Sequence, residues 1–120
     1  MTLDEFFVGY AESRPLFEAV CHVIEELGPI ELVVSKSQIA FHGTGQRSTV
    51  ARVWLPRRYL HRGAPLVLTL GFRQRDPSPR WKEIVEPQPG HFTHHLELWT
   101  VTDIDDEVRA WLQAAWANAV

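Results

Sequence analysis

The stretch LVLTLGF at Leu66–Phe72 decides the fold, because it alternates with the period of a β-strand. Every second residue from Leu66 is large and apolar, whereas Val67, Thr69 and Gly71 fall on the opposite face. The first face is predicted to pack in the core. Four further strands are expected around this one, and the short turns between neighbours favour antiparallel pairing. These strands are predicted at residues 30–35, 38–42, 49–55 and 92–100.

Helical patterns flank the strands at both ends of the chain. Thr2 and Glu5 form a capping-box pattern that starts a short helix over residues 3–10. Ser13 is the predicted N-cap of the next helix, which Gly28 and the following proline end. The apolar stripe of this helix is Phe17, Val20, Cys21, Ile24 and Leu27.

The last helix is predicted to start at Thr102, with Asp105 at its third position. The chain is therefore predicted to be α+β: a helix, an antiparallel sheet of about five strands, and a helix, with both helices on one face of the sheet. The opposite face would be at least partly open. The apolar stripe of the last helix is Ile104, Val108, Trp111, Leu112, Ala115 and Ala119.

Three stretches between the strands are not assigned to helix or strand. Residues 56–65 are predicted to be a basic loop. Residues 81–85 are ambiguous between strand and loop, and residues 87–90 are predicted to form a turn. The glycines at residues 43–45 are interpreted as a hairpin turn, because they lack the lysine and the following helix of a phosphate-binding loop.

Length and composition predict one domain over residues 1–120, with enough apolar residues for a single core. Cys21 is the only cysteine and has no patterned base beside it, so it is interpreted as a small apolar residue of a cytoplasmic protein. The acidic start of the chain lacks the basic and apolar segments of an export signal. No stretch is long and apolar enough for a membrane span, so no membrane partner is expected.

Charge is segregated along the chain. Ten of the twelve Lys and Arg residues lie between residues 36 and 82, where Asp76 is the only acid. The other fourteen acids lie before residue 36 or after residue 82, most of them in or beside the predicted helices. The predicted sheet is thus basic and the predicted helices are acidic, although the formal net charge is only -3.

The strand alternation predicts a working surface on the open face of the sheet. Val50, Arg52 and Trp54 share one strand face, and His95 and Trp99 share one face of the last strand. Together with Thr69, these residues would form a shallow basic and aromatic surface, of the kind that binds ligands. Lys36 follows the core parity of its strand and is predicted to reach solvent or a ligand from the strand end.

Arginines in two loops extend this predicted surface. Arg57 and Arg58 lie in one loop and Arg73 and Arg75 in the other, with Trp81 nearby as an aromatic group. We therefore expect a non-enzymatic module that binds an anionic ligand or an acidic protein surface. Nucleic-acid binding, a small enzyme of unknown reaction and a homodimer through Trp54 or Trp99 stay open as alternatives. The full predicted set is Lys36, Arg52, Trp54, Arg57, Arg58, Arg73, Arg75, Trp81, His95 and Trp99.

No catalytic residue, metal ligand or cofactor is predicted from the pattern. His91 and His95 are about 13 Å apart on one strand face, at about 3.3 Å per residue, which is too far to share a zinc ion. His94 points to the other face. No serine lies in a nucleophile motif. The acids at residues 103–107 are interpreted as partners of a helix N-terminus rather than as iron ligands.

The blocks SKSQIAF at residues 35–41, HHLEL at residues 94–98 and DDEVRAWL at residues 105–112 resemble a bacterial family, the domain-of-unknown-function family 5655. The resemblance covers residues 6–119. It implies a compact helix-sheet-helix domain that occurs alone or appended to larger bacterial proteins. It also implies a distant similarity to iron-chaperone-like domains of the frataxin type, so iron or metal handling stays open as a further alternative function. It supplies no catalytic residue.

Overall fold

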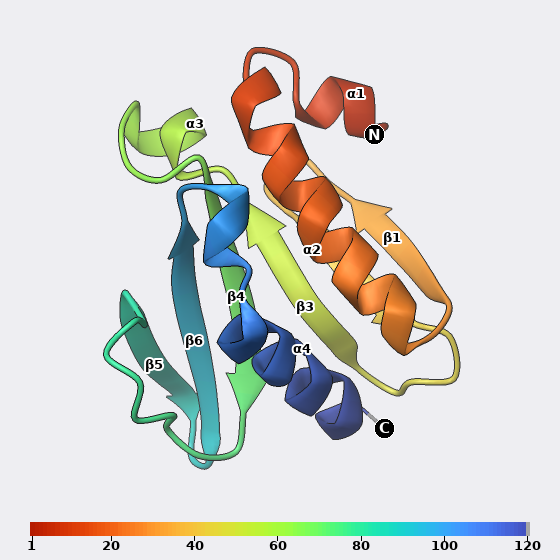
Figure 1. Cartoon of the computed structure of the whole chain (residues 1–120), viewed down its shortest axis with the longest axis vertical. Helices are drawn as coiled ribbons and strands as arrows, with labels where there is room; N and C mark the ends of the chain where they lie inside the picture. The colour runs from red at the N-terminus through yellow and green to blue at the C-terminus, as the bar shows by residue number, and fades with distance from the viewer. Residues whose placement is uncertain (120) are drawn as a thin grey trace.

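The computed structural model describes residues 1–119 and is an α+β fold, in which an antiparallel sheet packs against helices (Figure 1). Its long helices are α2 (Arg14–Leu27) and α4 (Asp106–Asn118), and its shorter ones are α1 (Leu3–Phe6), η1 (Ala11–Ser13), α3 (Pro56–Leu60) and η2 (Val101–Asp103). The strands are β1 (Ile30–Val34), β2 (Ile39–Gly43), β3 (Thr49–Trp54), β4 (Leu66–Phe72), β5 (Glu83–Gln88) and β6 (His91–Leu98).

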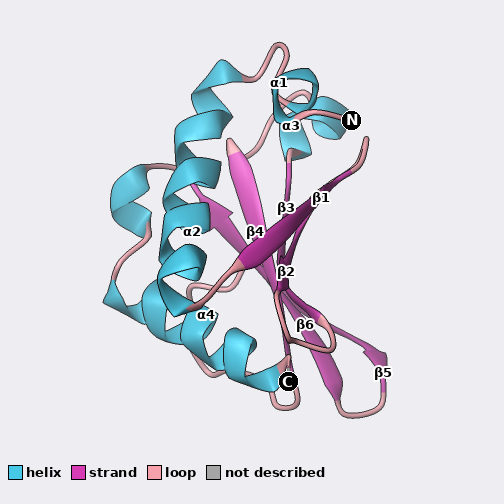
Figure 2. Ribbon diagram, turned by 90° about the vertical axis from the view of Figure 1, so that its right-hand side faces the viewer, coloured by secondary structure: helices cyan, strands magenta, loops and turns pink. Residues whose placement is uncertain are grey.

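The molecule has two layers. All neighbouring strands pair antiparallel, in the order β1-β2-β3-β4-β6-β5. Helices α2 and α4 pack against each other on one face of the sheet, and the opposite face carries no long helix (Figure 2). Short helices α1 and α3 lie at one end of the sheet, and the last turn of α4 lies at the other (Figure 1). We call the end with α1 and α3 the α3 end. We call the opposite end the cleft end, because a cleft described below lies there.

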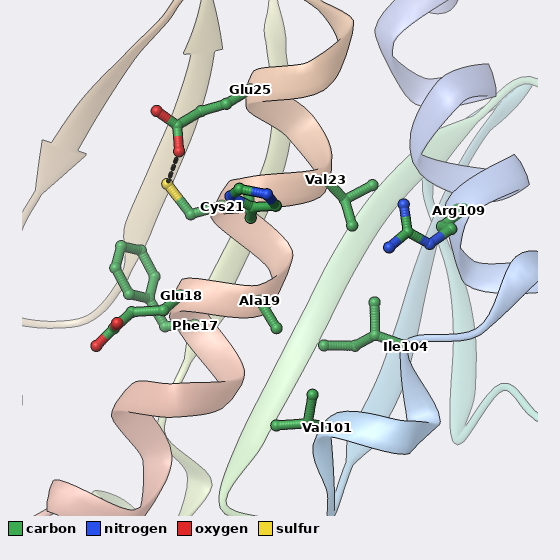
Figure 3. Close-up of a pocket in the computed structure, with 10 residues that line it drawn as sticks. Phe17, Glu18, Ala19, Cys21, Val23, Glu25, Val101, Ile104 and Arg109 are labelled. Carbon is green, nitrogen blue, oxygen red and sulfur yellow. Dashed lines mark hydrogen bonds between the residues drawn. The ribbon is translucent and has the colours of Figure 1, made fainter.

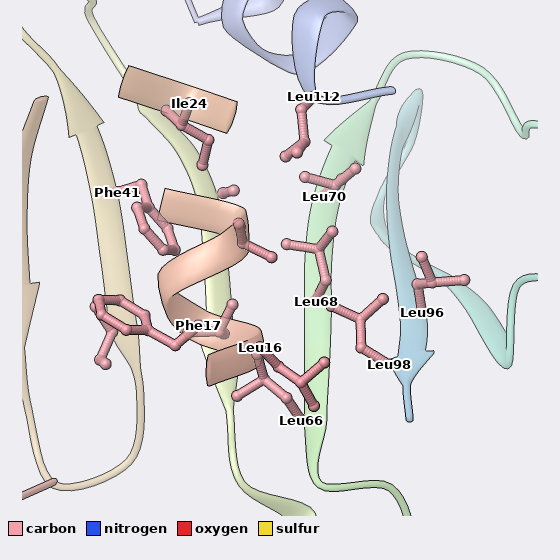
Figure 4. Close-up of a cluster of buried hydrophobic side chains, with 14 of the residues drawn as sticks. Leu16, Phe17, Ile24, Phe41, Leu66, Leu68, Leu70, Leu96, Leu98 and Leu112 are labelled. Atoms are coloured by element: carbon pink, nitrogen blue, oxygen red, sulfur yellow. The ribbon is translucent and has the colours of Figure 1, made fainter. Parts of the chain in front are cut away.

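The predicted apolar face of β4 forms the centre of the core (Figure 4). Leu66, Leu68 and Leu70 are fully buried beneath the two helices. The rings of Phe17 on α2 and Phe41 on β2 stack with centroids 5.8 Å apart. A strand with one apolar face and helices with one apolar stripe can bury these surfaces only against each other, which explains the two layers.

The structure corrects two of the strand and loop predictions. The sheet has six strands rather than five, because β5 extends from the ambiguous segment into the predicted turn. Pro87 lies within β5, at a register irregularity on the edge of the sheet, where a proline is tolerated. The predicted basic loop at residues 56–65 begins with helix α3. Pro56 is the first residue of α3, a position that suits the fixed φ angle of proline.

One predicted helix start is confirmed and one is wrong. Ser13 is the N-cap of α2 as predicted, but its side chain makes no capping hydrogen bond, because η1 holds it in helical dihedrals directly before α2. The last helix starts at Asp106 instead of Thr102. Asp105 is its N-cap and accepts a hydrogen bond from the Val108 backbone N–H at 3.1 Å. Thr100 caps the separate turn η2.

Two glycines fix the C-terminal end of α4 on the sheet. A Cβ atom at Gly28 would lie 2.6 Å from the indole of Trp116, and one at Gly43 would lie 2.8 Å from the same ring. The ring can therefore lie between these two backbone segments only because neither carries a side chain. Gln46 Nε2 also donates to the Trp116 carbonyl at 3.1 Å. These contacts hold α4 beside the turn that leads into β3.

Candidate functional site

The sheet splits at its cleft end. The pairing of β3 with β4 ends at Arg52 and Thr69, whereas β4 continues to Phe72 against β6 alone. The start of β3 instead follows β2, where the register shifts and adds one residue to β3. This shift places Val50 in the core, where it is 2% exposed, and not on the open face as the strand alternation predicted.

A cleft of about 450 Å³ occupies this split. Its walls come from the start of β3, the end of β4 and the start of β6, and the last turn of α4 closes it on the helical side. We call it the basic cleft. It is lined by Arg47, Ser48, Thr49, Val50, Ala51, Arg52, Thr69, Gly71, Phe72, Arg73, His91, Phe92, Thr93, Ala115, Asn118 and Ala119.

Three arginines give the basic cleft its charge. Arg47, Arg52 and Arg73 are all exposed, and none of them forms an ion pair with any of residues 1–119. No aspartate or glutamate is among the described lining residues. Four hydroxyl side chains on the walls supply further hydrogen-bonding groups: Ser48, Thr49, Thr69 and Thr93.

The backbone positions Arg47 at the mouth of the cleft. The backbone N–H groups of Arg47 and Ser48 both donate to the carbonyl of Ala119, at 2.6 and 3.1 Å. The turn before β3 is therefore tied to the end of α4. Arg47 is a functional candidate that the sequence reasoning missed. Its signal was the antiparallel pairing, which brings residues before β3 to the same sheet end as residues after β4.

A row of side chains crosses the open face next to the basic cleft. In register order it contains Arg52, Thr69, His95 and Glu83. Thr69 Oγ1 and His95 Nδ1 share a hydrogen bond of 2.8 Å. Burial lowers the pKa of His95, in spite of the nearby Glu83 carboxylate. This histidine is therefore neutral near pH 7 and can both donate and accept hydrogen bonds.

The aromatic members of the predicted surface are separated. Trp54 lies on the open face, and its ring is nearly perpendicular to that of His95, at a centroid distance of 6.4 Å. Trp99 follows the end of β6 and is 52% exposed at the α3 end. Trp81 is 8% exposed and packs in the core, with its ring centroid 4.1 Å from that of Trp111. Its predicted role as a surface aromatic group is wrong.

Trp81 belongs instead to a buried polar network around Asp76. The indole N–H groups of Trp81 and Trp111 each donate to the Asp76 carboxylate at 3.1 Å, and Ser78 N–H donates at 3.0 Å. Burial by itself would raise the pKa of Asp76, but these hydrogen bonds outweigh it and lower that pKa. The lone acid of the basic stretch therefore anchors the loop between β4 and β5.

His94 completes the network on the core side of β6. The Asp76 N–H donates to His94 Nε2 at 3.0 Å, so the proton of the neutral ring lies on Nδ1, which faces the Phe92 carbonyl at 3.0 Å. The ring is fully buried between Phe72 and Trp81. Burial lowers the pKa of His94. This histidine thus has a structural position, and strand alternation placed it correctly on the core face.

The arginines of α3 are used by the chain itself. Arg58 donates to the backbone carbonyls of Lys36 and Phe6, and its guanidinium lies 4.8 Å from the centroid of the Phe6 ring. Arg57 donates to the Gly63 carbonyl at 2.9 Å and pairs with Glu12 at 3.2 Å. The α3 helix therefore joins the N-terminal segment to the sheet.

The remaining predicted residues lie apart. Lys36 lies in the exposed segment between β1 and β2, beyond the end of β1. Arg75 is exposed in the loop after β4, and its guanidinium lies 5.2 Å from the centroid of the Phe92 ring. Of the predicted set, Arg52 and Arg73 line the basic cleft, Arg75 lines a hollow beside it, and His95 neighbours Arg52 across Thr69. Trp54 ends β3 close to α3 and lies toward the α3 end.

A second hollow, of about 540 Å³, lies on the helical side between α2 and the η2–α4 segment (Figure 3). Its apolar walls include Val23 and Ile104, and Arg109 reaches across toward α2. The Cys21 thiol donates to Glu25 Oε1 at 3.5 Å. Burial, with the neighbouring Glu25 carboxylate, raises the pKa of Cys21 to about 12. The thiol is therefore protonated and unsuited to nucleophilic attack.

Neither a metal cluster nor a bilayer span is found in the described part of the chain. Among residues 1–119, no three His, Cys, Asp or Glu side chains are grouped so that they could hold a metal ion. None of the described helices combines the length and the apolar character that a membrane crossing requires. Two of the acids at residues 103–107 have partners within the chain. Asp105 caps α4 and pairs with Arg80 at 2.9 Å, and the Asp103 carboxylate accepts hydrogen bonds from the Trp99 and Thr100 N–H groups.

Comparison with known proteins gives one match. The family model described as "Domain of unknown function (DUF5655)" matches residues 3–119. No curated protein and no solved structure matches the chain. The match covers the basic cleft, the Asp76 network and both long helices.

Proposed function

We propose that this chain, which belongs to the DUF5655 family of domains of unknown function, is a binding module that holds an anionic ligand in its basic cleft. One observation carries the proposal. Arg47, Arg52 and Arg73 meet at a cleft without a carboxylate among its described walls, and no described residue pairs with them. Three positive charges around one cleft repel one another, so a bound anion would relieve this repulsion.

The chemistry of the walls suits a small anion. Guanidinium groups present several N–H donors in a fixed plane, which matches carboxylate and phosphate oxygens. The hydroxyl groups of Ser48, Thr49 and Thr93 can donate to further oxygens. Small-molecule sites usually have volumes of about 300–1,000 Å³, and the cleft falls within that range. The apolar rings of Phe72 and Phe92 would exclude water from one side of the ligand.

The distribution of the other arginines favours a small ligand over an extended nucleic acid. A nucleic-acid surface needs several free cations along a track, with exposed aromatic groups between them. Arg57, Arg58 and Arg80 instead bind groups of the chain itself, and Trp81 is buried. The free arginines that line a cavity gather at the cleft end.

A titration with inorganic phosphate tests the proposal directly. Backbone amide NMR shifts of the full chain are followed in low-salt buffer, with Arg52→Gln and Arg73→Gln as variants. We expect saturable shifts around the basic cleft, and about a tenfold weaker affinity in each variant, which corresponds to ~1.4 kcal/mol. Rising salt should weaken the binding.

Arg62→Gln is the matched control, because Arg62 is exposed and forms no ion pair with the described residues, and it lies outside the cleft. It removes the same charge from the chain. If phosphate produces no saturable shift, or if Arg62→Gln weakens binding as much as Arg52→Gln, the cleft is not an anion site.

A further inference from the structure

A third hollow adjoins the basic cleft. It has a volume of about 380 Å³ and lies between the loop after β4 and helix α4. Phe72, Arg73 and Asn118 line both hollows. The basic cleft and this hollow are therefore neighbours that share one wall. We call the 380 Å³ hollow the side hollow.

The side hollow has a basic group of its own. Arg75 lines it and is absent from the basic cleft. The Arg75 guanidinium lies 5.2 Å from the centroid of the Phe92 ring, which also lines the basic cleft, so one aromatic side chain contacts both Arg75 and that cleft. Neither Arg73 nor Arg75 forms an ion pair within residues 1–119.

One carboxylate, that of Asp76, is also on the wall of the side hollow. Its oxygens accept hydrogen bonds from two indole N–H groups and one backbone N–H, and it pairs with neither Arg73 nor Arg75. Asp76 thus fixes the loop that carries both arginines while it leaves their guanidinium groups free. This arrangement would hold Arg73 and Arg75 apart at the two sides of one wall.

Resting on the proposed function, we infer that the ligand carries two linked phosphoryl groups, one in the basic cleft and one in the side hollow, with Arg73 between them. A terminal phosphoryl group presents three acceptor oxygens, whereas a carboxylate presents two. The basic cleft offers guanidinium groups and hydroxyls, and the side hollow offers the guanidinium groups of Arg73 and Arg75 beside side-chain amides, so the two adjoining spaces together match the larger set of oxygens. Arg47 and Arg52 face the first group, and Arg75 faces the second.

Calorimetric titrations of the full chain with orthophosphate and pyrophosphate, at one ionic strength, test this inference. We expect pyrophosphate to bind at least tenfold more tightly than orthophosphate. Arg75→Gln should remove most of this preference and change orthophosphate affinity less than twofold. Arg52→Gln should weaken both ligands. The melting temperature of each variant shows whether it is folded, and Arg75→Lys serves as a second variant that keeps the charge without the planar fork.

The outcomes separate the two proposals. If neither anion binds, the proposed function itself is wrong. If orthophosphate binds but pyrophosphate gains nothing, or if Arg75→Gln keeps the full preference, only the second phosphoryl group is wrong. Arg62→Gln, which removes one charge far from the side hollow, should keep the preference. A dicarboxylate such as succinate that binds as tightly as pyrophosphate would also overturn the inference.

Discussion

The arginines at the two ends of the sheet differ in what their guanidinium groups contact. At the α3 end, Arg57 and Arg58 bind backbone carbonyls, aromatic rings and Glu12, and so join separate segments of the chain. At the cleft end, Arg47, Arg52 and Arg73 have no ionic partner among the described residues. The same residue type thus stabilises the fold in one region and remains available in the other. The contacts of each guanidinium, rather than the local density of charge, identify the candidate site.

The largest expected effect on stability comes from the α3 end. Arg58→Met should lower the free energy of unfolding by about 3 kcal/mol, because it removes two charge-assisted hydrogen bonds and the stacking on Phe6. Urea denaturation measures the change. Arg52→Gln is the matched cleft-end variant and should change stability by less than about 0.5 kcal/mol. Equal destabilisation by the two variants would contradict the comparison.

A smaller effect is expected for Arg80, which links the loop after β4 to the start of α4. It pairs with Asp105 at 2.9 Å and with Glu107 at 3.0 Å. These side chains are partly exposed, so solvent screens the pairs. Arg80→Gln should therefore cost about 1 kcal/mol, and the loss should shrink in high salt. A loss that is independent of salt would show that the carbonyl contact to Asp103, and not the ion pairs, dominates.

The smallest effect is local and depends on pH. Burial lowers the pKa of His94 below its ordinary value of 6.5, so the unfolded chain takes up a proton at a higher pH than the folded chain. The contribution of neutral His94 is therefore complete above pH 6.5 and is lost as the pH falls below it. Amide hydrogen exchange at Asp76, whose N–H donates to His94, should quicken as the pH falls below 6.5, after correction for the intrinsic rate.

His94→Gln should make this pH dependence shallower, because glutamine can accept the same hydrogen bond without titrating. Backbone amides of α3 should show no matching change, since His94 and His95, the two histidines whose pKa is lowered, both lie on β6. An identical pH profile in wild-type protein and variant would show that another group is responsible. His95, whose pKa is also lowered by burial, would then be the next group to replace.

Much of the sheet could be predicted from local pattern. The alternation of β4 and β6 placed Thr69 and His95 on one face, and the structure puts them in one register pair. Local pattern failed where a segment depends on distant partners. Strand β5 is an exposed edge strand with a proline, so its sequence has no apolar alternation. Its strand conformation comes from pairing with β6.

The candidate site could be predicted only in part for the same reason. Arg52 and Arg73 were identified because strand parity and charge are visible in the sequence. The use of Arg58 was not visible, because its partners Phe6 and Lys36 lie 52 and 22 residues away. The burial of Trp81 was not visible for the same reason, since it depends on Trp111 of the last helix. Such contacts form only when the tertiary structure assembles.

The early end of the β3–β4 pairing gives the sheet an internal edge in addition to its two outer ones. Unpaired strand backbone is a template for other extended chains and promotes aggregation. Charged side chains at such edges act as gatekeepers against this association. Arg47, Arg52 and Arg73 border the gap, so their charge also disfavours pairing with a foreign strand. A bound anion would cancel this positive charge, but it would also occupy the gap and so cover the unpaired backbone.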